Sequence, residues 1–332
     1  MTAKTSGLRI QELGATLDFS ILVSEFASLT FDGIVVGAIY ALVALGYTLV
    51  YGVLRLINFA HSEIFMIGTM ACYAVTLALG ISTDADPLVM SSFVLVFSLI
   101  IVIAGLASGA SAVVLEFVAY RRLRKMKASR LSSLISAIGA SFFLTELFRI
   151  LTDSKNIAFP RLIDKEPIFV ISSAYVTADK LFVIVGAALL FFILNRVINH
   201  SKLGLGIRAV SQDETTSVLM GVNVNRVVSL TFLIGGILAG AGSAFYMVFY
   251  ETTKANVGFL VGVSAFTAAV LGGIGNVRGA LVGSFVLGLI QQYSSAVLGY
   301  NWRDVVTFVI LVLVLLVKPT GLLGEALQRA RV

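Results

Sequence analysis

The sequence predicts an all-α protein that crosses a membrane eight or nine times. Hydrophobic residues make up 58% of the 332 residues and charged residues only 13%, a balance unlike that of soluble globular chains. The mean hydropathy is +0.99. The apolar residues form long uncharged runs, and about 20 consecutive apolar residues are enough for a helix to cross the hydrocarbon core of a bilayer. These observations predict a polytopic membrane protein.

Each uncharged run is a candidate span. The runs are 34–54, 64–81, 88–115, 131–145, 181–195, 227–250, 255–277, 279–302 and 305–317. The run 305–317 is short, so a basic neighbour, Arg303 or Lys318, would have to extend its charge toward the interface. The run 255–277 is rich in glycine, which predicts a broken or re-entrant helix. The expected count is therefore eight or nine spans.

The basic residues predict which segments face the cytoplasm. The densest basic cluster consists of Arg121, Arg122, Arg124, Lys125, Lys127 and Arg130. Because short cytoplasmic loops are enriched in Lys and Arg, this cluster is expected inside, and counting spans places segment 199–226 inside too. The same count places loop 82–87 and segment 152–180 outside. This bias explains the net charge of +6, so no nucleic-acid partner is expected.

Three parts are expected along the chain. Residues 1–30 carry charges and one apolar helical face, which suits a helix lying in the membrane interface, in contact with lipid. Residues 31–324 would form the transmembrane domain, with 199–226 as its cytoplasmic segment. Residues 325–332 would form a cytoplasmic tail. Segment 152–180 contains two prolines and is long enough to form a small structured cap outside.

The polar segment 202–225 lies between two membrane runs. Ser211 and Glu214 have the spacing of a capping box, which predicts a short helix from near Gln212. Gly221 suits the left-handed residue that ends a helix. The last helical residues would be Val218, Leu219 and Met220. An apolar helix end within a polar segment predicts a docking element, and an ordinary structured loop is the alternative.

Polar residues gather at the start of the second run. They are Asn58, His61, Ser62 and Glu63. A histidine and a carboxylate two residues apart would suit a proton relay or a metal site, but too few ligands accompany them. Helix capping and packing at the start of this span are the better account.

The motifs of an enzyme are missing from the sequence. No G-x-x-x-x-G-K-[ST] occurs, so the chain has no P-loop, and no H-E-x-x-H occurs among its two histidines. Cys72, the one cysteine, lies in an apolar run and is expected to be a small buried hydrophobe. Glu146 and Arg149, three residues apart, are expected to pair on one helical face. The chain is therefore expected to be non-catalytic, with no bound cofactor or metal.

Glycine pairs predict close contacts between helices, because lipid offers no hydrophobic drive for helix association and small residues let backbones approach. The G-x-x-x-G pairs are Gly105 with Gly109, Gly236 with Gly240, Gly258 with Gly262, Gly275 with Gly279, and Gly279 with Gly283.

Four blocks of sequence together resemble one family. The segment YALVALGYTLVYGVLRLINFAHSEIFMIG (40–68) resembles the signature of LivH-type permeases, the membrane subunits of branched-chain amino acid ABC importers, and contains Asn58, His61 and Glu63. LISAIGASFFL (134–144), GIRAVSQDETTSVLMGVNVNRVVSLTFLIGG (206–236) and FTAAVLGGIGNVRGALVGSFVLGLI (266–290), followed by VLLVKPTGLLG (314–324), resemble the same family in the same order. Ser62 and Ser217 depart from it, because the family usually has glycine and alanine there.

The resemblance implies an ABC importer permease fold and a division of labour. Segment 199–226 would be the coupling segment that docks on ATPase subunits. Its expected coupling residues are Gly206, Arg208, Ala209, Asp213, Glu214, Leu219, Gly221 and Asn223. The implied partners are two ATPase subunits that use ATP and Mg²⁺, a second permease of LivM type, and an external substrate-binding protein. The implied function is half of an amino-acid path across the bacterial inner membrane.

Two rival functions remain open on the sequence alone. Urea permeases share the N-x-A-H-G-E region, but Phe59 stands where the urea systems have methionine, which favours amino acids over urea or another small polar solute. A secondary transporter working alone would require carboxylates or histidines near the middle of the spans and discontinuous spans in corresponding halves. The sequence shows no such residues there and no clear twofold repeat. A membrane-embedded enzyme is opposed by the missing catalytic motifs.

Overall fold

The computed structural model describes residues 9–10, 15–16, 20–126 and 128–324. Its helical segments are α1 (Ser20–Ser24), α2 (Phe26–Leu54), α3 (His61–Ala78), α4 (Met90–Leu115), the π-helical η1 (Glu116–Arg121), α5 (Arg122–Lys125), α6 (Arg130–Leu151), α7 (Ala178–His200), α8 (Lys202–Gln212), α9 (Glu214–Leu219), α10 (Val224–Tyr250), α11 (Val257–Gly272), α12 (Val277–Leu298), the 3-10 turn η2 (Tyr300–Trp302) and α13 (Arg303–Val317). The strands form three short antiparallel pairs: β1 (Arg9–Ile10) with β2 (Ala15–Thr16), β3 (Ile157–Ala158) with β6 (Thr252–Thr253), and β4 (Pro167–Ile171) with β5 (Ala174–Thr177).

Long apolar helices confirm the all-α, multi-span prediction. Seven helices among the described residues are long and apolar enough to cross a membrane: α2, α4 with η1 and α5, α6, α7, α10, α12, and α13 with η2. Two further helices occupy the remaining predicted runs, α3 with 18 residues and α11 with 16. The predicted break in the glycine-rich run is wrong, because α11 is one continuous helix from Val257 to Gly272, and the chain leaves the helix only at the connection to α12.

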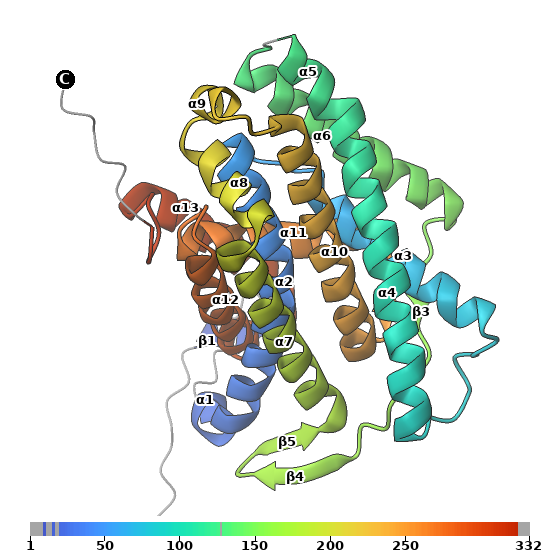
Figure 1. Cartoon of the computed structure of the whole chain (residues 1–332). Coiled ribbons are helices and arrows are strands. Elements are labelled where there is room, and N and C mark those ends of the chain that lie inside the picture. Colours follow the sequence, from blue (N-terminus) through green and yellow to red (C-terminus); the bar gives the residue numbers. More distant parts are fainter. Residues whose placement is uncertain (1–8, 11–14, 17–19, 127, 325–332) are drawn as a thin grey trace, which may run out of the picture.

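Helix α2 lies at the centre of the bundle (Figure 1). In the most apolar stretch of 18 consecutive residues, 94% of the residues of α2 are buried, whereas only 6% of those of α6 are. Two glycines let α12 approach α2 closely: a Cβ at Gly37 would lie 2.8 Å from the Cα of Phe285, and one at Gly33 would lie 2.9 Å from the Cα of Leu289. Close backbone approach at small residues is the usual means of packing helices in lipid.

The predicted close packing at glycine pairs is present between α4 and α10. A Cβ at Gly236 would lie 2.7 Å from the carbonyl oxygen of Ser108, and one at Gly240 would lie 2.3 Å from that of Ala104. The pair Gly258 and Gly262 on α11 packs against α3 in the same manner, because added Cβ atoms there would collide with the α3 backbone and Ser62. Any side chain at these positions would force the helices apart.

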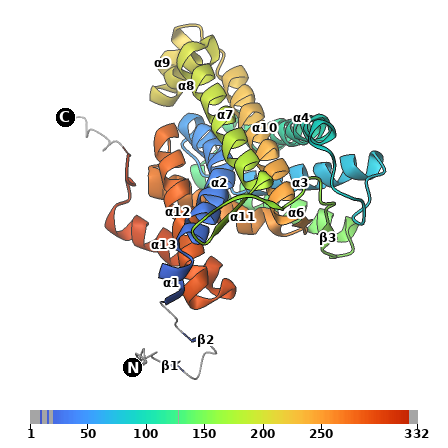
Figure 2. The same ribbon diagram turned by 90° about the horizontal axis from the view of Figure 1, so that it is seen from below.

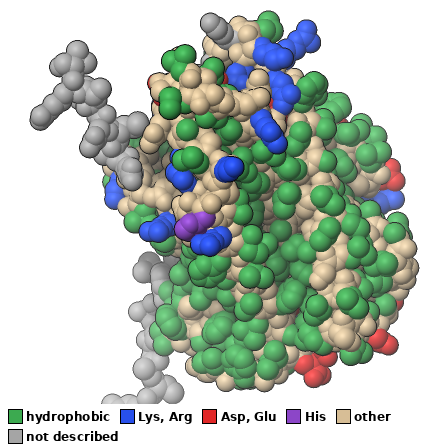
Figure 3. Space-filling model, viewed as in Figure 1, with side chains coloured by type: hydrophobic (Ala, Val, Ile, Leu, Met, Phe, Trp, Pro, Cys, Tyr) green, Lys and Arg blue, Asp and Glu red, His purple; other side chains and the backbone are tan. Residues whose placement is uncertain are grey.

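The connections gather at two ends, which we call the inner and outer ends after the predicted orientation. Helices α5, α8 and α9 lie at the inner end (Figure 1). Lys and Arg side chains cluster around α5 there, and acidic side chains appear at the opposite end (Figure 3). At the outer end, segment 152–180 forms the β4–β5 hairpin (Figure 1), and its strand β3, labelled in Figure 2, pairs with β6, so the small structured cap expected there is present. Lys165 ties this cap to α10 through Glu251, with Nζ 2.8 Å from Oε1.

Several sequence predictions are corrected or confirmed by the helices. Arg303 does not extend toward the interface: its side chain is buried, because α2, α10 and α12 offer it hydrogen-bond acceptors. Helix α2 begins at Phe26 and therefore includes residues assigned to the interfacial segment. Cys72 is buried, and Glu146 pairs with Arg149 as expected. Half of segment 1–30, namely residues 1–8, 11–14 and 17–19, and the whole tail 325–332 lie outside the described residues.

Candidate functional site

The predicted coupling segment folds as two helices at the inner end. Ser201 caps α8 by accepting a hydrogen bond from the backbone N–H of Gly204, at 3.0 Å. A Cβ at Gly204 would lie 1.9 Å from the carbonyl oxygen of Ile198, so only glycine lets the chain turn this sharply out of α7. Ile207 and Val210 are buried on the face of α8 that meets the bundle. Helix α8 is therefore held firmly on the transmembrane helices.

The start of α9 corrects the predicted capping box. Ser211 lies inside α8, where its Oγ donates to the carbonyl oxygen of Arg208, and it caps nothing. Asp213 is the N-cap instead: its Oδ1 accepts from the N–H groups of Thr215 and Thr216, at 2.8 and 3.1 Å. The backbone of Asp213 is extended (φ −151°), as an N-cap requires, whereas Ser211 is helical. Glu214 is an exposed first-turn residue and not the second member of a box.

The hydrogen bonds to Asp213 also affect its charge. The hydroxyl of Thr216 donates to Oδ2 at 2.6 Å. These bonds from Thr216 and Thr215, together with the nearby positive charge of Arg55, lower the pKa of the Asp213 carboxyl. The Asp213 carboxyl is therefore ionised at neutral pH. Its negative charge stabilises the start of α9, because the backbone N–H groups there carry partial positive charge.

The end of α9 matches the sequence prediction and leaves an apolar surface uncovered. Gly221 has a left-handed backbone (φ +82°), and the N–H of Val222 donates to the carbonyl oxygen of Ser217 at 3.0 Å, which closes the helix. The preceding three side chains are exposed: Val218 by 56%, Leu219 by 82% and Met220 by 80%. We call them the apolar tip.

Arg55 connects the end of α8 to the centre of the bundle, and the sequence analysis assigned it no role. It follows α2, and its Nη2 donates to the carbonyl oxygens of Ser211 and Gln212, at 2.6 and 3.2 Å. These carbonyls belong to the last turn of α8, where a cation is favourable. Arg55 thus joins α2 to the junction between α8 and α9. A lone arginine directly after the first span was the available signal.

The remaining predicted coupling residues support the same arrangement. Arg208 is exposed and donates to the carbonyl oxygen of Ile198, so it contacts a helix C-terminus within its own chain. Asn223 caps α10 by accepting from the N–H of Arg226, at 3.1 Å. Gly206 is buried against Val227, and Ala209 is half-buried. Each of these residues shapes the segment, and the apolar tip is the part left free.

A buried charge cluster lies beneath the segment. Glu116 in η1 is fully buried and pairs with Arg121 at 2.9 Å and with Arg124 at 3.1 Å. Arg124 also donates to Asn225 at the start of α10, at 2.7 Å. The cluster links the basic loop, which the sequence analysis used only to predict orientation, to the helix that follows the coupling segment. A groove of about 590 Å³ lies between this loop and α9.

The second group of predicted residues is buried at the start of α3. The hydroxyl of Tyr120 donates to Oδ1 of Asn58 at 2.8 Å, and Oε1 of Glu63 accepts from Ser141 at 3.1 Å. His61 packs edge-on against Tyr47, and its two ring nitrogens have no hydrogen-bond partner among the described residues. No side chain caps α3. The packing part of the prediction is therefore confirmed, and the capping part is wrong.

Ser62 replaces a residue that is usually glycine in the resembled family, and the structure shows how it fits. Its Oγ donates to the carbonyl oxygen of Phe59 at 2.6 Å. A Cβ at Gly262 would lie 2.2 Å from the Cβ of Ser62. The contact between α3 and α11 therefore has room for the serine side chain on α3 only while position 262 on α11 is glycine. No group of three or more metal-ligating side chains occurs among the residues that the structure describes.

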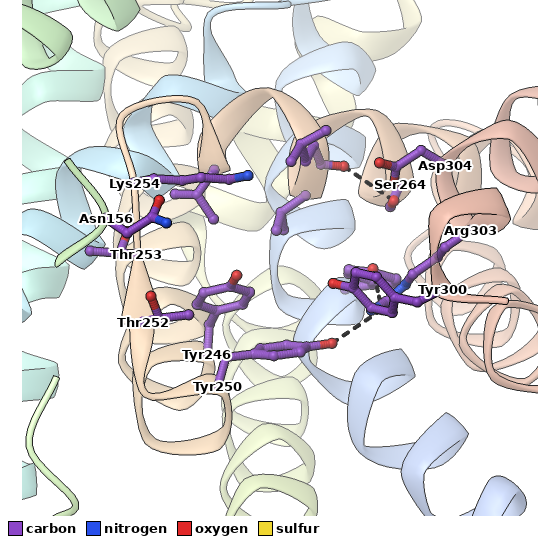
Figure 4. Close-up of a pocket in the computed structure, with 14 residues that line it drawn as sticks. Asn156, Tyr246, Tyr250, Thr252, Thr253, Lys254, Ser264, Tyr300, Arg303 and Asp304 are labelled. Carbon is purple, nitrogen blue, oxygen red and sulfur yellow. Dashed lines mark hydrogen bonds between the residues drawn. The ribbon is translucent and has the colours of Figure 1, made fainter. Parts of the chain in front are cut away.

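A polar cavity lies at the outer end, and sequence reasoning did not find it (Figure 4). It has a volume of about 290 Å³ and is lined from α2, α10, α11 and α13. Arg303 lines it, with 8% of the residue exposed. The residues contributed by α10 include Tyr246 and Tyr250, whose rings point into the space beside it. A charged residue at the border of an otherwise apolar run was the signal in the sequence.

Comparison with known proteins identifies the family. A family model described as "Branched-chain amino acid transport system / permease component" matches residues 29–315. The chain belongs to this permease family. BraD of Pseudomonas aeruginosa, named a high-affinity branched-chain amino acid transport system permease protein, is 41% identical over 298 residues, which cover 89% of this chain and 94% of the relative. The resemblance found in the sequence is confirmed.

Two further relatives of the permease show how similarity is distributed. LivH of Escherichia coli K12, also named a high-affinity branched-chain amino acid transport system permease protein, is 41% identical over 306 residues, covering 90% of this chain and 96% of the relative. The ribose import permease protein RbsC of the same organism is 26% identical over only 102 residues, covering 29% of this chain and 32% of the relative. Similarity along the whole permease is thus found with proteins named for branched-chain amino acids.

Proposed function

We propose that this permease forms half of the path by which an ATP-driven importer carries branched-chain or other neutral amino acids across the bacterial inner membrane. Support comes from relatives named for that transport, which are 41% identical over about nine-tenths of the chain. The other half of the path is a second permease of LivM type. An external substrate-binding protein delivers the solute.

The observation that carries the coupling role is the apolar tip. Three large apolar side chains at the end of α9 are uncovered in the chain alone, although Asp213 and Gly221 hold the backbone that presents them. Burial of each such side chain stabilises a complex by about 1.5–3 kcal/mol. A partner with a groove that accepts all three side chains would therefore bind α9 firmly. We assign this groove to the ATPase subunits, of which the transporter has two.

The division of labour follows from the missing P-loop. The ATPase subunits bind ATP and Mg²⁺, and this chain binds no cofactor. Closure of the ATPase pair pushes on the apolar tip, and the motion passes through α8 and Arg55 to α2. Because α2 packs against α10, α11 and α12, movement at its inner end reaches the core of the transmembrane domain.

Reconstituted transport tests this proposal. The permease, its LivM-type partner, the two ATPase subunits and the binding protein are placed in proteoliposomes, and uptake of labelled leucine is followed with and without ATP. Uptake that requires both ATP and the ATPase subunits is expected, and the purified permease alone should hydrolyse no ATP above background. Uptake of urea without leucine, or leucine uptake driven by an ion gradient without ATPase subunits, would contradict the proposal.

A further inference from the structure

The outer cavity contains a buried cation that has no anionic partner. Three acceptors receive hydrogen bonds from Arg303: Oε1 of Gln291 from Nε at 2.9 Å, the hydroxyl of Tyr40 from Nη2 at 2.9 Å, and the hydroxyl of Tyr250 from Nη2 at 3.1 Å. All three acceptors are neutral. No acidic side chain forms an ion pair with Arg303 among the described residues. A buried arginine is ordinarily paired, because an uncompensated charge in a low-dielectric site is costly.

The free donors of Arg303 identify what is missing. A guanidinium has five N–H groups, and the three hydrogen bonds use the one on Nε and both on Nη2. Nη1 therefore keeps two N–H groups that no described residue accepts. Arg303 lines the cavity (Figure 4), and hydrogen bonds to Tyr40 and Tyr250 hold its guanidinium in place. A held cation that lines a cavity and keeps unused donors is suited to an anionic group of a ligand.

The other lining residues narrow the ligand to a small amphiphilic molecule. Lys254, which forms no ion pair with a described residue, adds a second positive charge across the cavity from Arg303 (Figure 4), and Asp304 supplies a negative one. The α11 wall is apolar and consists of Val257, Leu260 and Val261. An α-amino acid carries a carboxylate, an ammonium group and, in the branched-chain case, an apolar side chain. Each of these groups has a counterpart in the lining.

From these contacts we infer that the outer cavity is a solute subsite in which Arg303 binds the carboxylate of the transported amino acid. The identification of the carboxylate as that of an amino acid rests on the proposed function. Because every α-amino acid has this carboxylate, Arg303 retains any of them, and the apolar wall favours those with aliphatic side chains. Tyr40, Gln291 and Tyr250 are positioning residues, since they orient the guanidinium without needing to touch the solute.

Protection of a cysteine in the cavity tests this inference on the assembled transporter. Thr252 lines the cavity and is exposed, so Thr252→Cys should react with a small thiol reagent, whereas the buried Cys72 should not. Millimolar leucine, added without the binding protein, should slow the reaction. Leucinamide, which lacks the carboxylate, should protect about 10- to 100-fold less well, because a hydrogen bond to a charged group is worth roughly 1.5–3 kcal/mol.

Substitutions then locate the effect. Arg303→Gln should abolish leucine protection, and Arg303→Lys should retain part of it because the charge remains. Arg149→Gln is the matched control, since Arg149 is an exposed, ion-paired arginine on α6 that does not line the cavity. If Arg303→Gln prevents assembly, the comparison of leucine with leucinamide in the Thr252→Cys transporter still decides the question.

Two outcomes would overturn the inference. Equal protection by leucine and leucinamide would show that no carboxylate is recognised in the cavity. Protection by the binding protein without solute, together with none by free leucine, would show that Arg303 accepts a carboxylate of that protein instead. In either case leucine uptake in the reconstituted assay could still be normal, so the proposed function would stand. Carboxylate-dependent protection in a transporter that imports no amino acid would instead refute the proposed function alone.

Discussion

Replacement of Gly221 by valine should uncouple the transporter without disturbing its insertion. Gly221 adopts φ +82°, and a Cβ there would have no neighbour within 4 Å. The cost of a side chain is therefore entirely one of backbone conformation and not of collision. A left-handed backbone costs a non-glycine residue roughly 1–2 kcal/mol, and a β-branched residue is among the poorest occupants of that region.

The size of the expected effect follows from this energy. A difference of 1.4 kcal/mol corresponds to a tenfold change in an equilibrium constant. The equilibrium constant for the left-handed helix end at position 221 should therefore fall by about 5- to 30-fold. Helix α9 has only six residues, so it has little other structure to hold its end in place. The apolar tip would then point away from its groove on the ATPase subunits.

Uptake of labelled leucine and substrate-stimulated ATP hydrolysis should fall together in Gly221→Val, at unchanged membrane levels. Gly221→Asn should be much milder, because asparagine tolerates the left-handed region. Gly139→Val is the matched control: Gly139 lies in α6 with open space around its Cβ position and no positive φ. Normal uptake by Gly221→Val would refute the coupling role. Equal damage from Gly221→Asn would show that the partner fills the space at Cβ, which would refute the backbone explanation.

Three further experiments test the remaining contacts and the orientation. Arg55→Ala removes two hydrogen bonds to the end of α8 and should weaken coupling by about 1 kcal/mol, measured as lower uptake per ATP hydrolysed. Arg208→Ala loses a single exposed hydrogen bond and should be milder, and the reverse order would contradict the proposed link. Asp213→Ala should impair coupling and Asp213→Asn should not, since asparagine keeps the capping oxygen. Because the pKa of Asp213 is lowered in the folded state, its contribution to stability is present above the unfolded pKa and is lost only as pH falls through the folded pKa. Coupling near neutral pH should therefore not change through the titration of Asp213. Cysteine at Gln212 should resist an impermeant thiol reagent in spheroplasts while cysteine at Asp84 reacts, and labelling of Gln212→Cys without permeabilisation would overturn the orientation.

Local patterns in the sequence were sufficient for some features of the coupling segment and not for others. Gly221 was predicted to end the helix because a left-handed residue is a property of one position and glycine is suited to it. The cap was misassigned because Ser211 and Asp213 are both good N-caps, and the choice depends on where the preceding helix stops. Helix α8 continues to Gln212 because Ile207 and Val210 are buried against the bundle, and this extension places Ser211 inside a helix.

The buried arginine shows the same limit more strongly. From the sequence, Arg303 was expected to extend toward the interface beside a short span. Its acceptors are Tyr40, Gln291 and Tyr250, and Tyr40 is 263 residues away in the chain. Residues so far apart in sequence meet only when α2 and α13 pack together, and no spacing rule connects them.

The sequence by itself determined the membrane class, the order of the spans, the gathering of basic residues at one end and the position of the polar segment. These properties depend on composition, on the length of apolar runs and on the placement of basic residues, and all three can be read directly from the sequence. Only the tertiary structure decided that Asp213 caps α9, that Arg55 joins α2 to the segment, and that Arg303 lines a cavity. These depend on which helices pack side by side, because a hydrogen bond between distant residues forms only when packing brings donor and acceptor to within about 3 Å.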